Sequence, residues 1–230
     1  MIRAVIFDMD GLMIDTEKLL VKYWLEAAHY YGIPMKREHV INIRSLAAKY
    51  AIPKLQAELG RDFDYYKIRK LRIQLMNEHI ERYGIEEKHG LGELLDYLKS
   101  NHYLTAVATA TDYERTSRYL GSLDRLKYFD QIVCATMVEN SKPEPDIYLE
   151  AASRLQIDPS LCMALEDSPN GILSAYRAGM YPVMGPDLSM PDEETNKILY
   201  RCVSDLTEVI PLLNRFDKRN AEIDSYRDKI

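Results

Sequence analysis

The fold is decided by Ile2-Arg3-Ala4-Val5-Ile6-Phe7 and the residues that follow it, Asp8-Met9-Asp10-Gly11. An apolar run of this length, ended by acidic residues, is typical of a strand buried on both faces of a parallel sheet. The run is far shorter than the roughly 20 residues that cross a bilayer, so we expect neither a signal peptide nor a membrane anchor. The sequence therefore predicts a first strand whose carboxyl end is acidic.

The stretch from residue 16 to about 87 has helical periodicity and no clear strand. One apolar stripe consists of Leu20, Tyr23, Trp24, Ala27 and Tyr31, and a second consists of Ile68, Leu71, Leu75 and Ile80. Gly32 and Gly84 are expected to end these helices. Between them, Leu46–Tyr50 suggests a short helix that is cut by Pro53. We therefore expect an all-helical domain, residues 16–87, inserted after the first strand.

From Gly90 onward, strand-like and helical segments alternate. The strand-like segments are 103–109, 131–135, 161–165, 182–184 and 202–203, each followed by a helical pattern. Such alternation predicts an α/β fold, a Rossmann-like parallel sheet flanked by helices. Residues 1–15 and 88–216 would form this core domain, and residues 217–230 would form a charged C-terminal tail to which we assign no function.

Composition excludes several classes of protein. Of 230 residues, 47% are hydrophobic and 29% charged, and 30 basic against 36 acidic residues give a net charge of −6. These values fit a folded domain and argue against a general nucleic-acid or membrane role. Cys134, Cys162 and Cys202 form no CxxC pair, which indicates buried, reduced thiols in a cytoplasmic protein.

Chemistry-bearing residues follow three of the predicted strands. Asp8 and Asp10 follow the first strand, Thr109 ends the second, and Glu166-Asp167 follow the strand at 161–165. Ligands of open parallel sheets bind at the carboxyl ends of the strands, so these side chains are expected to converge. Clustered carboxylates without nearby His or Cys favour Mg²⁺. A carboxylate, a cation and a lysine, here Lys142 on a loop, together suit a phosphate group, which a carboxylate can attack.

Four stretches resemble, in order, the motifs of the haloacid dehalogenase superfamily. They are Phe7-Asp8-Met9-Asp10-Gly11-Leu12-Met13-Ile14-Asp15-Thr16-Glu17, Val107-Ala108-Thr109-Ala110-Thr111, Ser141-Lys142-Pro143-Glu144-Pro145-Asp146-Ile147-Tyr148 and Leu165-Glu166-Asp167-Ser168-Pro169-Asn170-Gly171-Ile172. The helical insertion resembles the cap of the subfamily that contains β-phosphoglucomutase and many small-metabolite phosphatases.

This resemblance implies roles for individual residues. Asp8 would be the nucleophile that forms an aspartyl-phosphate, and Asp10 the general acid and base. Mg²⁺ would be held by the Asp8 carboxylate, the Asp10 backbone carbonyl and Asp167, with Glu166 in support. The Thr109 hydroxyl and the Ala110 N–H would bind phosphate oxygens. Lys142 would offset the charge of the carboxylate and the phosphoryl group.

The substrate is expected to be a small phosphorylated metabolite, such as a sugar phosphate, and the protein a monomer. Hydrolysis is favoured because the cap stretch Asn42-Ile43-Arg44-Ser45 lacks the glycine and distal arginine with which mutases of the subfamily grip a second phosphate. A β-phosphoglucomutase-like mutase is the alternative, since Arg44 offers a cation for an anion. A phosphoacceptor module of the receiver type is a third. Whether Arg69, Lys70 and Arg72 face the substrate depends on their side of the helix, which the sequence leaves open.

Overall fold

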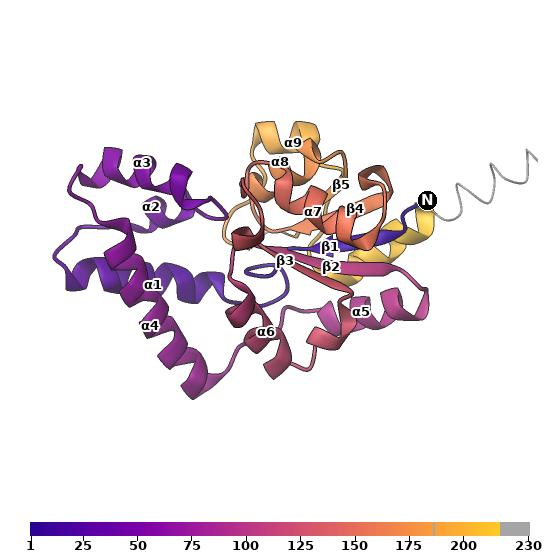
Figure 1. The fold of residues 1–230 in the computed structure, drawn as a ribbon, viewed down its shortest axis with the longest axis horizontal. Helices are drawn as coiled ribbons and strands as arrows, with labels where there is room; N and C mark the ends of the chain where they lie inside the picture. The colour runs from indigo at the N-terminus through magenta and orange to yellow at the C-terminus, as the bar shows by residue number, and fades with distance from the viewer. Residues whose placement is uncertain (186, 217–230) are drawn as a thin grey trace, which may run out of the picture.

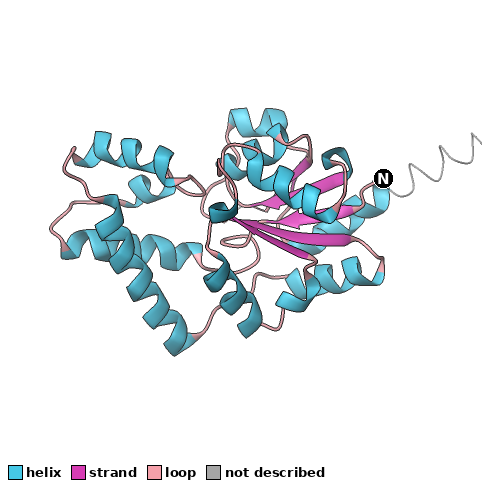
Figure 2. Cartoon of the chain, viewed as in Figure 1, coloured by secondary structure: helices cyan, strands magenta, loops and turns pink. Residues whose placement is uncertain are grey.

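Six parallel strands form the core sheet in the order β3-β2-β1-β4-β5-β6. The strands are β1 Ala4–Phe7, β2 Leu104–Thr109, β3 Gln131–Cys134, β4 Cys162–Glu166, β5 Tyr181–Met184 and β6 Arg201–Cys202. The computed structural model describes residues 1–185 and 187–216. The expectation of a parallel α/β sheet with helices on both faces is confirmed (Figure 2).

Alternate residues of the strands face two separate apolar layers. Val5 and Phe7 pack in one layer, which contains large side chains from α5, α6 and the helical residues 209–216. Ala4 and Ile6 pack in the other, where small alanines of β2, β4, α7 and α8 allow the helices to approach the sheet closely. The two layers bury the central strand completely, which explains its uninterrupted apolar run.

The helices that cover the sheet follow the strands in chain order. They are α5 Leu91–Ser100, α6 Tyr113–Ser122, α7 Asp146–Leu155, α8 Pro169–Arg177 and α9 Glu193–Ile198. Short 3₁₀ turns lie at Leu126–Tyr128, Ala135–Met137, Pro159–Leu161 and Leu206–Glu208. Figure 1 shows α7, α8 and α9 on one side of the sheet and α5 and α6 on the other.

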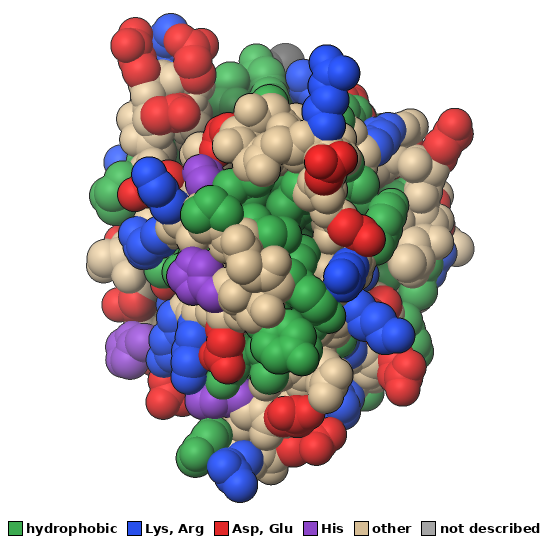
Figure 3. All heavy atoms as spheres, turned by 90° about the vertical axis from the view of Figure 1, so that its left-hand side faces the viewer, with side chains coloured by type: hydrophobic (Ala, Val, Ile, Leu, Met, Phe, Trp, Pro, Cys, Tyr) green, Lys and Arg blue, Asp and Glu red, His purple; other side chains and the backbone are tan. Residues whose placement is uncertain are grey.

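The helices α1 Glu17–Tyr30, α2 Arg37–Ile41, α3 Ala48–Leu59 and α4 Tyr65–Tyr83 form a separate group between β1 and α5, which we call the cap. The cap lies at the left of Figure 1. Its own apolar cluster includes Trp24, Leu55, Phe63 and Ile68. Figure 3, which views the molecule from the cap end, shows basic and acidic side chains interspersed on this face.

Two local expectations were wrong, and one short helix was not foreseen. Helix α3 runs through Pro53, because Ala51 and Leu55 are buried in the cap cluster and their packing offsets the missing N–H. Helix α2 was not foreseen, since five residues are too few to show a helical period. Cys202 is half-exposed, although Cys134 and Cys162 are buried and all three are free.

The predicted charged C-terminal tail, residues 217–230, lies outside the described residues. Among the helices that are described, none combines the length and apolarity that a bilayer crossing requires.

Candidate active site

The ends of three neighbouring strands bring the acidic motifs to one edge of the sheet. Phe7 of β1 pairs with Val107 of β2 and with Leu165 of β4. The residues that come next in each strand therefore lie side by side at the carboxyl edge. This register places Asp8 between the second and fourth motifs, as expected for a ligand site of an open parallel sheet.

Lys142 is the buried cation of this edge. Its side chain is fully buried, and its Nζ lies 2.5 Å from Asp8 Oδ1 and 2.6 Å from Glu166 Oε1. It also donates a 2.9 Å hydrogen bond to the Ala108 carbonyl. Although burial opposes the lysine charge, the Asp8 and Glu166 carboxylates raise the pKa of Lys142 above its ordinary value. Lys142 is therefore held as a cation against the Asp8 carboxylate.

The surroundings of Asp8 and Asp167 disfavour the negatively charged form of both carboxyl groups. Burial raises the pKa of Asp8 well above its ordinary value, Lys142 opposes this shift, and Glu166 and Asp167 add to it. Burial likewise raises the pKa of Asp167, and there Arg44 is the opposing cation. Both groups would be stabilised as anions by an additional cation among them.

A divalent metal ion fits this cluster. Carboxylate oxygens of Asp8, Glu166 and Asp167 lie within 4.8 Å of one another, and all three residues are buried. Asp167 Oδ1 is buried without a hydrogen-bond partner among the described residues. A buried, unpartnered carboxylate oxygen beside two further carboxylates is a donor set suited to a hard cation such as Mg²⁺.

Two glycines leave room for these carboxylates. A Cβ at Gly11 would meet the Asp167 carboxylate and would lie 2.7 Å from Glu17 Cγ, and φ there is +87°. A Cβ at Gly171 would meet the Glu166 carboxylate. The glycines of the first and fourth motifs thus serve a steric purpose, which is to let carboxylates lie against the backbone.

Asp10 is held apart from the buried cluster by two hydroxyls. Thr16 Oγ1 donates to Asp10 Oδ1 at 2.6 Å, and Thr111 Oγ1 donates to Asp10 Oδ2 at 2.7 Å. Thr111 comes from the second motif, and Thr16 is the N-cap residue of α1, at the entrance to the cap. The Asp10 side chain is consequently not one of the grouped carboxylates, which agrees with a role through its backbone carbonyl or as a proton carrier.

A cavity of about 110 Å³ connects this edge to the cap. Asp8, Asp10, Thr109 and Ala110 line its core side, whereas Lys142, Glu166 and Asp167 are buried behind them. Its cap side consists of residues from three of the cap helices and the α2–α3 connection: Glu17, Leu20, Trp24, Val40, Ile43, Arg44, Ser45, Leu46, Tyr65, Arg69 and Arg72. A second hollow of about 860 Å³ between α1 and α4 contains none of the site residues expected from the sequence.

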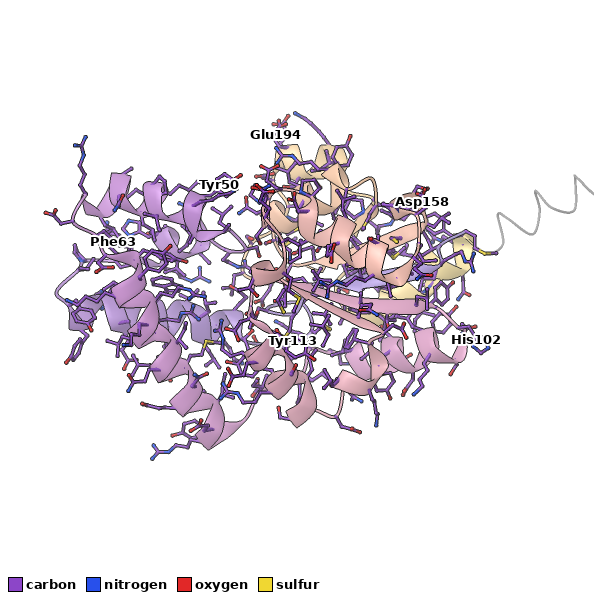
Figure 4. All side chains as sticks on the ribbon, viewed as in Figure 1. Tyr50, Phe63, His102, Tyr113, Asp158 and Glu194 are labelled. Atoms are coloured by element: carbon purple, nitrogen blue, oxygen red, sulfur yellow. The ribbon has the colours of Figure 1, made fainter. Side chains whose placement is uncertain are left out.

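Cap and core are joined by polar contacts near the third and fourth motifs. The Tyr50 hydroxyl donates to Glu144 at 3.1 Å, and Figure 4 shows Tyr50 on the side of α3 that faces the core. The Ala47 N–H donates to the Lys142 carbonyl at 3.2 Å, and Asn170 Nδ2 donates to the Arg44 carbonyl at 2.9 Å. The cap therefore closes over the cavity in this structure.

Arg44 has partners that the sequence did not indicate. Its guanidinium contacts the Asp167 carboxylate and lies 2.8 Å from Glu17 Oε2, and it is 3% exposed. Burial raises the pKa of Glu17 to about 8, with Arg44 opposing. The sequence offered Arg44 as a cation for a substrate anion, but in the structure two carboxylates of the protein already pair with it.

Sequence reasoning also missed the polar contacts of Thr16, Thr111 and Tyr148. The Thr16 and Thr111 hydroxyls both donate to Asp10. The Tyr148 hydroxyl donates to Glu166 at 2.6 Å from α7. The Thr111–Asp10 and Tyr148–Glu166 contacts join residues 101 and 18 positions apart, so no local signal in the sequence identifies them.

Comparison with known proteins agrees with this geometry. The model of the haloacid dehalogenase-like hydrolase family matches residues 5–184. The chain is 32% identical, over 83% of its length and 88% of the relative's, to a phosphorylated carbohydrates phosphatase of Thermotoga maritima. It is 28% identical to the β-phosphoglucomutase of Bacillus subtilis, over 81% of this chain and 88% of that one.

A solved structure has a similar fold over nearly the whole chain. The crystal structure of a putative β-phosphoglucomutase from Thermotoga maritima superposes with a TM-score of 0.68 at 29% identity, covering 93% of this chain and 99% of that chain. The matched family region includes the strands that carry the acidic edge. The chain therefore belongs to the haloacid dehalogenase-like hydrolase family.

Proposed function

We propose that the protein is a cytoplasmic, Mg²⁺-dependent phosphatase that hydrolyses a small phosphorylated metabolite, such as a sugar phosphate, through an aspartyl-phosphate. The observation that carries this proposal is the buried Asp8 carboxylate, 2.5 Å from Lys142, at the wall of a cavity that Asp10 also lines. A relative that is 32% identical is named a phosphatase of phosphorylated carbohydrates, which supports the same substrate class. We expect it to act as a monomer.

In the first half-reaction, an Asp8 oxygen attacks phosphorus and the bond from phosphorus to the substrate oxygen breaks. Asp10 donates a proton to the leaving alcohol, and the Thr111 and Thr16 hydroxyls that hold its carboxylate fix its direction. Thr109 and Ala110 line the cavity, and in this mechanism the Thr109 hydroxyl and the Ala110 N–H bind phosphoryl oxygens. Lys142, which contacts Asp8, balances the charge of the carboxylate and the phosphoryl group.

In the second half-reaction, Asp10 accepts a proton from water as the water oxygen attacks phosphorus. The bond between phosphorus and the Asp8 oxygen then breaks, which releases inorganic phosphate and restores the carboxylate. The cap excludes other water from the cavity during this cycle.

Asp8 and Asp167 would hold Mg²⁺, with the Asp10 carbonyl as a further ligand and Glu166 in support. When bound, the metal ion neutralises charge on the carboxylate and phosphate oxygens so that two anions can meet. Glu166 also contacts Lys142 and Tyr148, so it would link the metal ligands to the lysine.

A phosphosugar mutase is the second candidate, since a relative that is 28% identical is named β-phosphoglucomutase. A mutase must return its phosphoryl group to a second hydroxyl rather than to water. Arg44 is already paired with Asp167 and Glu17, which leaves it less available to hold the far end of a bisphosphate.

A panel of phosphorylated metabolites, assayed for phosphate release with Mg²⁺ and with chelator, tests the proposal. We expect Mg²⁺-dependent release from a subset of monoesters. Hexose 1-phosphate with a catalytic amount of hexose bisphosphate forms the second arm of the experiment. Isomerised hexose phosphate without free phosphate would favour the mutase, and the absence of any metal-dependent turnover would contradict both functions.

A further inference from the structure

The cap wall of the cavity contains a buried arginine that lacks an anionic partner. Arg72 of α4 is 5% exposed and lines the same cavity as Asp8 and Asp10. Its guanidinium lies 5.5 Å from the centre of the Trp24 ring, and one nitrogen is 3.7 Å from Met76 Sδ. Within the described part of the chain, no hydrogen-bond acceptor reaches Arg72 Nε and no carboxylate pairs with the guanidinium. Arg72 is thus fixed by packing rather than by an opposite charge.

Neighbouring cations make this position still less favourable. Arg69 and Arg115 line the same cavity, and Arg115 is already bound to Asp112 at 2.7 Å. Burial, and then the charges of Arg115 and Arg69, lower the pKa of Arg72 to about 10. A buried, unpaired charge beside like charges destabilises a fold unless a ligand supplies the opposite charge.

The opposite wall already contains the groups that the phosphoryl transfer uses. Asp8, Asp10, Thr109 and Ala110 lie on the core side, and Arg44 is occupied by Glu17 and Asp167. An anion opposite Arg72 would therefore belong to the part of the substrate that does not react. A planar guanidinium with free N–H groups binds carboxylates and phosphates in particular.

We propose that Arg72, flanked by Arg69 and Arg115, binds a second anionic group of the substrate, a carboxylate or a second phosphate, while the reacting phosphate lies at Asp8. This inference rests on the proposed function and narrows its substrate class to phosphate monoesters that carry a second negative charge. Trp24, stacked on the guanidinium, positions it for that group.

Binding to the Asp8→Asn protein tests the proposal without turnover. The probes are matched pairs that differ in the second charge: 3-phosphoglycerate against glycerol 3-phosphate, and fructose 1,6-bisphosphate against fructose 6-phosphate. Calorimetry is expected to show tighter binding of the doubly anionic member of one pair. The pair that shows it identifies the group as a carboxylate or a phosphate.

In the Arg72→Met background that preference is expected to fall about 10- to 100-fold, the usual effect of removing a charged hydrogen bond. Lys70→Met is the control, because Lys70 carries the same charge on the same helix but is exposed and does not line the cavity. It is expected to leave the preference unchanged. Arg69→Gln, at a half-exposed position, is a second variant and is expected to reduce the preference by less.

Thermal unfolding distinguishes a ligand-binding arginine from a structural one. Because Arg72 is buried without a partner, Arg72→Met is expected to raise the melting temperature of the free protein while weakening binding. Equal or undetectable binding of both members of both pairs, or a preference that survives Arg72→Met, would overturn the proposal. Phosphate release from the simple ester p-nitrophenyl phosphate by the unmodified protein tests the proposed function separately.

Discussion

The core wall and the cap wall of the active-site cavity differ in how their buried charges are balanced. On the core wall, Lys142 contacts both Asp8 and Glu166, and the carboxylates are close enough to share a metal ion. On the cap wall, Arg72 lies over Trp24 without an acid, beside Arg69. The first wall is arranged around charges that the protein itself supplies, and the second leaves positive charge facing the cavity.

This difference separates two tasks. Phosphoryl transfer needs a nucleophile, a lysine and a metal ion in fixed positions, so their charges are paired before the substrate arrives. Selection of a substrate needs charge that is satisfied only by the correct ligand, and such a residue weakens the free protein. Arg44 belongs to the first group although it lies on the cap, since it contacts Asp167 and Glu17.

The largest expected effect is that of Asp8→Asn on the core wall. We expect kcat to fall on the order of 10³-fold or more, because no other carboxylate that lines the cavity follows β1 directly. The fold should persist, since asparagine has the same shape. Single-turnover phosphate release measures the loss and circular dichroism checks the fold. Wild-type turnover in a well-folded Asp8→Asn protein would refute the assignment of the nucleophile.

Lys142→Met tests the balance of the core wall directly. The substitution leaves the Asp8 and Glu166 carboxylates buried without their cation, which we expect to cost about 3–5 kcal/mol of the free energy of unfolding. Urea denaturation measures it. Lys127→Met is the matched control, because Lys127 pairs with Asp124 on the exposed surface and should have no measurable effect. Similar stability of the two variants would contradict the idea of a charge-balanced wall.

Arg44→Met tests whether this cap residue stabilises the core carboxylates. We expect a loss of about 2 kcal/mol in chelator, smaller than for Lys142 because Glu17, whose pKa is raised to about 8, takes up a proton readily. Mg²⁺ should reduce the loss, since a bound metal ion would supply Asp167 with an alternative cation. Denaturation with and without Mg²⁺ measures the difference, and an identical loss under both conditions would argue against a metal ion at Asp167.

Much of the core wall could be predicted from the sequence because it depends on rules of local order. The apolar run before Asp8 predicts a central strand, and parallel strands bring their carboxyl ends to one edge. Asp8, Thr109 and Glu166 each lie at the end of an apolar run that predicts a strand. The sequence alone therefore predicts that they share one edge of the sheet. The glycines at positions 11 and 171 belong to the same motifs, and the structure supplies the steric reason for them.

The cap wall could not be predicted in the same way. Whether Arg72 faces the cavity depends on how α4 is rotated against α1. Basic residues occur at several nearby positions of α4, so the sequence does not show which of them points inward. The contact of Arg44 with Asp167 joins residues 123 positions apart, and that of Thr111 with Asp10 joins residues 101 apart. The Arg44–Asp167 contact follows from the closed position of the cap, and the Thr111–Asp10 contact follows from the pairing of β1 with β2. Helical periodicity predicts neither of them.

The smallest expected effect concerns Asp112, the N-cap residue of α6, whose partner Arg115 lines the cavity. Its carboxylate caps α6 by accepting the Arg115 N–H at 3.0 Å, and it also binds the Arg115 side chain. Asp112→Ala should cost about 1 kcal/mol near neutral pH, the usual value for a lost helix cap. Burial opposes the shift, but these hydrogen bonds lower the pKa of Asp112 below 3.8.

The sign of the pH dependence follows from that lowered pKa. The folded protein favours the charged carboxylate, so its contribution is present above the unfolded pKa and is lost as the pH falls through the folded one. Stability curves of Asp112→Ala and the unmodified protein should therefore converge below about pH 3.8. Because the variant also frees Arg115 beside Arg72, it should strengthen the preference for doubly anionic ligands. A weaker preference would mean that Arg115 needs Asp112 to reach the ligand, and would reduce the anion site to Arg72 and Arg69.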